Sequence, residues 1–146
     1  MTTKDQQQEI IAKMRQWQKI EKESIASADQ VMQKTDNPII QLVMEIIQRD
    51  SQMHYKVQDW IADSLESETV YLNPEEFAAV WVMIEHHMEI EKKMAEAVEK
   101  VLSSLGDRAI PIQKYLLNYL ADEENKHAHL LSNLEEVKKW MTGHPY

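Results

Sequence analysis

The chain has 146 residues, 43% hydrophobic and 28% charged, with only two glycines and four prolines, a composition that predicts long helices in one domain over 1–146. The 25 acidic and 16 basic side chains give a net charge of −9, which argues against a nucleic-acid-binding surface and against a basic membrane-binding face. The absence of cysteine excludes disulfides, iron–sulfur clusters, cysteine nucleophiles and cysteine-based zinc sites.

The start of the chain lacks the apolar core of a signal peptide. No run of residues approaches the roughly 20 apolar positions that a membrane-spanning helix needs. We therefore expect a cytoplasmic protein.

Prolines and glycines divide the chain into four predicted helices. Asn37 precedes Pro38 and Asn73 precedes Pro74, which is typical of a helix N-cap followed by proline in the first turn. Gly106 indicates the end of a helix. The predicted helices span about 4–34, 38–66, 74–105 and 109–140.

Each predicted helix carries an apolar stripe with spacings of three and four residues. Four such stripes predict an all-α fold, a four-helix bundle. Polar residues interrupt every stripe near mid-helix, so antiparallel pairing of the helices would bring these residues into one layer. The interruptions are Glu21, Asp50, His54, His87, Glu91, Glu123 and His127.

An internal repeat relates the two halves of the chain. Residues 20–31 align without gaps on 90–101, and residues 49–54 align on 122–127. The alignment matches Glu21 with Glu91, Asp50 with Glu123, and His54 with His127. The sequence therefore predicts two related helical hairpins.

The charge of this polar layer indicates a metal centre. Four carboxylates cannot all stay ionised in an apolar core without compensation, and no lysine or arginine lies on the stripes at that level. Protonation, pairing with charged histidine, water or a metal could compensate them. Two divalent ions would supply +4 against −4, and oxygen and nitrogen ligands suit iron or manganese, with zinc also possible.

The EENKH segment, residues 123–127, resembles the Glu-x-x-His element of ferritin-like carboxylate proteins, through Glu124 and His127. The two hairpins with single glutamates are similar to rubrerythrin-type domains, here without a rubredoxin domain. The resemblance implies a ferritin-like bundle with a di-iron or di-manganese centre that reacts with dioxygen or peroxide as an oxidase, peroxidase or ferroxidase. In the second helix Ser51 occupies the position of the first glutamate of this element, so a mononuclear site also stays open.

The hypotheses thus name a ligand set and its alternatives. The predicted metal ligands are Glu21, Asp50, His54, His87, Glu91, Glu123, Glu124 and His127. For His87, a role in packing alone is as good an interpretation as metal binding. For Glu124, a solvated position is as good an interpretation as metal binding. The alternative functions are a non-catalytic helical bundle that forms a homodimer or docks a partner, and, less favoured, a storage cage.

The connection at about 67–73 limits the topology. It extends at most about 25 Å, at about 3.5 Å per residue, whereas a helix of 29 residues is about 43 Å long. A connection of this length predicts up-down-up-down topology. The crossover of the ferritin-like fold would require shorter helices.

Overall fold

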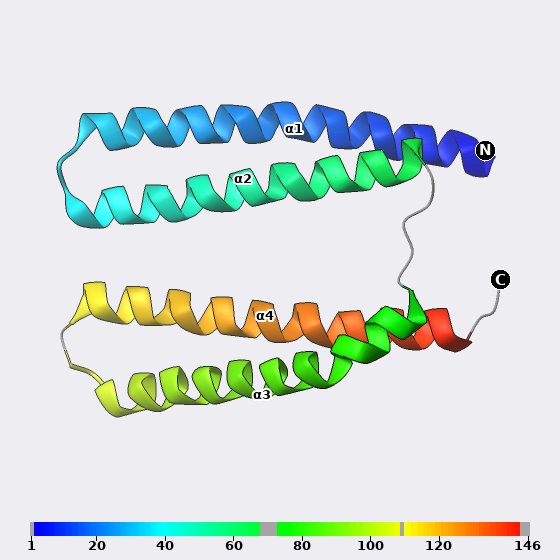
Figure 1. Cartoon of the computed structure of the whole chain (residues 1–146). Coiled ribbons are helices and arrows are strands. Elements are labelled where there is room, and N and C mark those ends of the chain that lie inside the picture. Colours follow the sequence, from blue (N-terminus) through cyan, green and yellow to red (C-terminus); the bar gives the residue numbers. More distant parts are fainter. Residues whose placement is uncertain (1, 68–72, 109, 144–146) are drawn as a thin grey trace. The chain divides into compact units, whose positions relative to one another are not determined.

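The computed structural model describes residues 2–67, 73–108 and 110–143, with side chains described up to residue 140. It contains four α-helices, which are α1 (Thr3–Lys34), α2 (Pro38–Glu66), α3 (Pro74–Leu105) and α4 (Pro111–Gly143) (Figure 1). No strand occurs within these ranges. The prediction of an all-α chain with four helices is confirmed, and only the ends of α4 differ by two or three residues from those predicted.

Local caps explain where α2 and α3 begin and where α3 ends. Asn37 Oδ1 accepts hydrogen bonds from the amides two and three residues further on, at 3.0 and 3.2 Å. Asn73 Oδ1 does the same at 2.9 and 3.5 Å. Gly106 follows α3 with φ +54°, a conformation that residues with a Cβ rarely adopt. These caps are encoded by adjacent residues, which is why the sequence predicts them well.

The chain divides into two compact units, Met1–Val70 and Tyr71–Tyr146. The first contains the α1–α2 hairpin and the second the α3–α4 hairpin (Figure 1). The single domain over 1–146 and the ferritin-like bundle stay predictions. The connection expected at 67–73 lies largely outside the described residues, so the predicted topology also stays a prediction.

The α1–α2 hairpin has a narrow seam between its helices. Ala28 and Ala62 are completely buried, because their small side chains let the two backbones approach each other. The other buried residues of this hairpin are Ile11, Met14, Gln18 and Ser51. The stripe that the apolar spacing predicts for α1 includes Ile10, Met14 and Trp17. It lies only partly in the seam, since Trp17 is 46% exposed and Ile10 is 43% exposed.

The α3–α4 hairpin buries larger side chains near one end. Phe77 and Trp81 of α3 stack with their ring centroids 5.3 Å apart, and Lys138 of α4 places its Nζ 4.4 Å from the centre of the Trp81 ring. Val98 and Ala121 are also buried. In the described part of the chain, no helix combines the length and the apolar character needed to cross a membrane.

Candidate metal centre

The middle of the α3–α4 hairpin brings two carboxylates and an imidazole together. Glu91, Glu124 and His127 each offer one ligand atom, and these atoms lie within 4.8 Å of one another. Glu91 comes from α3, whereas Glu124 and His127 are one turn apart on α4. Because residues three apart share a helix face, both α4 side chains meet Glu91 at the seam.

Glu91 is the centre of the hydrogen bonds in this cluster. Its two oxygens accept from His87 Nε2 at 2.9 Å and from His127 Nδ1 at 3.2 Å. His87 lies four residues before Glu91, on the same face of α3. The side chain of Glu91 is only 12% exposed, compared with 56% for His87 and 43% for His127. The cluster is therefore covered on the seam side and accessible on the imidazole side.

The hydrogen bond between the two carboxyl groups shifts their pKa values in opposite directions. A hydrogen bond to Glu91, together with burial, raises the pKa of Glu124. The same hydrogen bond lowers the pKa of Glu91, and the hydrogen bonds from His127 and His87 lower it further. Of the two carboxyl groups, Glu124 therefore holds a proton more readily than Glu91. A divalent ion needs both carboxylates ionised, so acid should weaken its binding at this position.

The donors fit an implied metal. Carboxylate oxygens and imidazole nitrogens are suitable ligands for iron, manganese and zinc. A cavity of about 260 Å³ adjoins the cluster and is lined by His87, Glu91, His127, Leu130 and Leu131. Three protein donors leave coordination positions open for further ligands, which can be water, a substrate or other side chains.

Glu123, which the heptad pattern placed in the polar layer, lies beside this cluster. Its Oε2 is 2.8 Å from Lys126 Nζ and 4.0 Å from His127 Nε2. The structure thus brings Glu124 to Glu91, as the resemblance to Glu-x-x-His implied, and leaves Glu123 on the flank. One residue of helix turns a side chain by about 100°, and the stripe alone could not choose between them.

The α1–α2 hairpin presents the aligned residues in a different arrangement. Glu21 Oε1 is 3.5 Å from His54 Nδ1 and accepts a hydrogen bond of 3.3 Å from Gln58 Nε2. Ser51 Oγ lies 2.9 Å from Ser24 Oγ. Asp50 is partly buried and His54 is exposed. This hairpin thus contains a carboxylate–imidazole pair, and the three-donor clusters among the described residues are confined to α3–α4.

The sequence patterns missed a polar network in α1–α2. Arg15 pairs with Asp59 at 2.6 Å and with Asp63 at 3.0 Å. The buried Gln18 donates to Asp59 Oδ1 at 3.2 Å. Trp17 belongs to the stripe predicted for α1, and Gln18 is the next residue in the chain. The apolar spacing therefore does not predict that Gln18 is buried, and only its contact with α2 shows this. The network joins the two helices and offers no convergent metal ligands.

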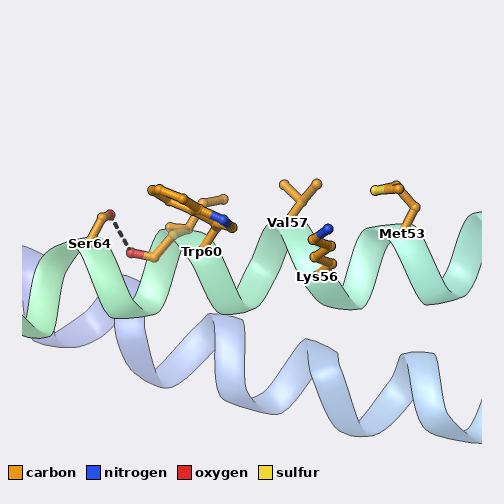
Figure 2. A pocket seen from close by; sticks show the side chains of 6 residues that line it. Met53, Lys56, Val57, Trp60 and Ser64 are labelled. Carbon is orange, nitrogen blue, oxygen red and sulfur yellow. Dashed lines mark hydrogen bonds between the residues drawn. The ribbon is translucent and has the colours of Figure 1, made fainter. Parts of the chain in front are cut away.

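A second cavity, of about 340 Å³, follows one face of α2 (Figure 2). Met53, Val57 and Trp60 project from the same side of the helix, and all three are about half exposed. Ser64 also lines this cavity, and its Oγ donates a hydrogen bond of 2.8 Å to the Ile61 carbonyl. A small-molecule site usually has several convergent polar groups. This surface is mainly apolar, and it is more typical of contact with another apolar surface.

Comparisons with protein-family models, curated proteins and solved structures find no match to this chain. The ferritin-like resemblance of residues 123–127 therefore remains a prediction from the sequence. The geometry of the α3–α4 cluster is the observation on which a functional hypothesis rests.

Proposed function

We propose that this chain is a metal-binding helical protein whose centre consists of Glu91, Glu124 and His127, with His87 as a further donor. The convergence of their ligand atoms within 4.8 Å supports this proposal. The natural ion is iron or manganese, and zinc also fits the donors. We also propose that the chain belongs to the ferritin-like class and binds a second ion.

The residues of the cluster have separate roles in this function. Glu91 and Glu124 provide the negative charge that balances a divalent ion, and His127 fixes a nitrogen ligand between them. His87 lies on the accessible side, where it holds Glu91 in place through their 2.9 Å hydrogen bond. Bound iron or manganese would supply redox chemistry with dioxygen or peroxide.

The proposal is tested by the metal content of the full chain. Protein reconstituted with Fe(II) without oxygen, with Mn(II) or with Zn(II) is desalted and measured by elemental analysis. We expect roughly one ion per chain, and its loss in His127→Ala. His129→Ala is the matched control, because His129 is an exposed histidine of the same helix. Full metal content in His127→Ala would contradict the proposal.

A second function, a non-catalytic interaction bundle, is favoured by the exposed apolar residues. Trp17 is 46% exposed and Trp60 is 55% exposed, and large exposed aromatic residues are typical of protein contacts. This function expects a protein that contains no metal and whose urea unfolding does not change with chelator. A chelator-dependent unfolding midpoint would favour the metal centre instead.

A further inference from the structure

We propose that the α3–α4 hairpin pairs with the same hairpin of a second copy of this chain, and that two sets of Glu91, Glu124 and His127 then hold two divalent ions. This inference rests on the proposed function and adds the partner that supplies the remaining ligands. Four observations carry it: the number of donors, their position along the helices, the surface around them and the composition of the other hairpin.

The donors of one hairpin are half of a two-ion set. Two-ion carboxylate sites in helical bundles use a glutamate from each of two helices and a Glu-x-x-His pair from each of two others. Here α3 supplies Glu91, and α4 supplies Glu124 and His127. A second copy of the hairpin doubles this set to four carboxylates and two imidazoles. Their charge of −4 then balances the +4 of two divalent ions.

The cluster lies near the middle of both helices. Glu91 is close to the centre of the 32 residues of α3, and His127 is close to the centre of the 33 residues of α4. A two-fold axis that passes beside the cluster therefore brings equivalent ligands together and lets both hairpins overlap along their whole length. Pairing of one surface with itself about a two-fold axis is the commonest form of homo-oligomer.

The surface around the cluster is suited to helix pairing. On α3, Val80, His87, Met94 and Val101 follow one another at intervals of seven residues, and the three apolar members are 45% or 46% exposed. Seven-residue spacing keeps side chains on the side of a helix that faces a partner helix. On α4, Leu130 is 62% exposed and also lines the cavity beside the cluster. Val80, Met94 and Val101 thus form an apolar line along α3 that passes the level of the ligands.

The α1–α2 hairpin is a poorer source of the missing ligands. Ser51 stands at the position aligned with Glu124, and its hydroxyl lies 2.9 Å from Ser24 Oγ. Gln58 occupies one oxygen of Glu21. This hairpin therefore lacks the second carboxylate of the seam, whereas a copy of α3–α4 supplies it.

Sedimentation of the full chain, free of metal and with Mn(II), tests the inference together with the Mn(II) content. We expect Mn(II) to strengthen dimerisation by at least about tenfold, because an ion bound only by the dimer shifts the equilibrium towards it. Binding of one ion per chain is expected in the dimer. Glu124→Ser should abolish both effects, and the aligned control His54→Ala should leave both unchanged.

Three further variants locate the interface. Val101→Lys leaves every ligand in place and should weaken the dimer, because it places a charge on the apolar line. Spin labels attached through His129→Cys, near mid-helix, should lie closer together across the dimer than labels attached through Lys114→Cys, near the start of α4. The chain has no other cysteine, so the label positions are unambiguous.

The remaining outcomes separate the two proposals. A monomer that binds Mn(II) and loses it in His54→Ala would overturn the inference and keep the metal function, with the chain's own α1–α2 hairpin as the source of ligands. A dimer that forms equally with and without Mn(II) would also overturn it. No binding of Mn(II), Fe(II) or Zn(II) by a folded chain would overturn the metal function and the inference together.

Discussion

At the centre of the α1–α2 hairpin, Ser51 Oγ lies 2.9 Å from Ser24 Oγ, whereas at the aligned place in α3–α4 the carboxyl group of Glu124 is hydrogen-bonded to Glu91. Both hairpins keep a glutamate on the first helix and a histidine on the second. The difference of one residue therefore separates a carboxylate–imidazole pair from a cluster of three donors, and it predicts different affinities for a metal.

Exchanging the residues at positions 51 and 124 has the largest expected effect, and the effect is on metal affinity. Glu124→Ser removes a ligand and a negative charge, and we expect metal affinity to fall by more than about 100-fold, beyond the loss typical of residues that only support a ligand. Isothermal titration with Mn(II) measures it. Ser51→Glu is the reciprocal change, and it should give α1–α2 a measurable affinity through Glu21 and His54. Unchanged titrations for both variants would show that this position does not decide metal binding.

The seam of α1–α2 provides the second test. Ala28 is completely buried there, whereas the aligned position in α3 holds the larger Val98. Ala28→Leu inserts atoms into a closely packed seam and should lower the free energy of unfolding by about 1–3 kcal/mol, measured by urea denaturation. Ala26→Leu is the matched control, since Ala26 is an exposed residue of the same helix. Equal stability of the two variants would contradict the close packing of this seam.

The caps provide a smaller effect that compares the hairpins directly. Asn37 begins the second helix of α1–α2, and Asn73 begins the first helix of α3–α4. Replacing either by alanine leaves two backbone amides without their acceptor and should cost about 1 kcal/mol of stability. Urea denaturation of the two variants checks this. Asn37→Asp is expected to retain the stability of Asn37, because aspartate is an equally good N-cap.

Local signals explain how much of the fold is predictable. An asparagine before proline, or a glycine after an apolar helix, acts on its own backbone. The starts of α2 and α3 and the end of α3 follow directly from these residues. The seam depends on which of two adjacent faces of a helix meets its neighbour. Met14 belongs to both the predicted stripe and the observed seam, whereas Trp17 lies on the exposed side and Gln18 on the buried side. Spacing of three and four residues fits either face.

The candidate site was predictable to the same degree. The repeat identified Glu91 and His127, since an aligned carboxylate and imidazole in both halves are visible in the sequence alone. The choice of Glu124 over Glu123 at the seam depends on the rotation of α4 against α3, and this is a tertiary property. The hydrogen bond between Glu91 and Glu124 likewise joins residues that lie 33 positions apart in the chain.

Acid should affect the stability of the two hairpins differently, because the ion pair between Arg15 and Asp59 belongs to α1–α2. The hydrogen bond from Arg15, with a second from Gln18, lowers the pKa of Asp59 below its ordinary value of 3.8. When the offsets of the repeat, 70 and 73 residues, are extended to Arg15 and Asp59, the corresponding residues of α3–α4 are Glu85 and Ser132, which cannot form this pair. A lowered pKa in the folded state stabilises the protein above the unfolded pKa, and this contribution is lost as the pH falls through the folded pKa.

Removing the Asp59 carboxylate should therefore make the stability of the protein depend less on pH in the acid range. In Asp59→Asn we expect the urea midpoint to change less than in the unmodified chain between about pH 5 and pH 2. The effect is the smallest of the series, because the Asp59 side chain is 46% exposed and solvent screens the pair. Asp36→Asn, at an exposed position before α2, is the control. If both variants kept the slope of the unmodified chain, the acid sensitivity would have to arise outside the Arg15 network, and this distinction between the hairpins would be lost.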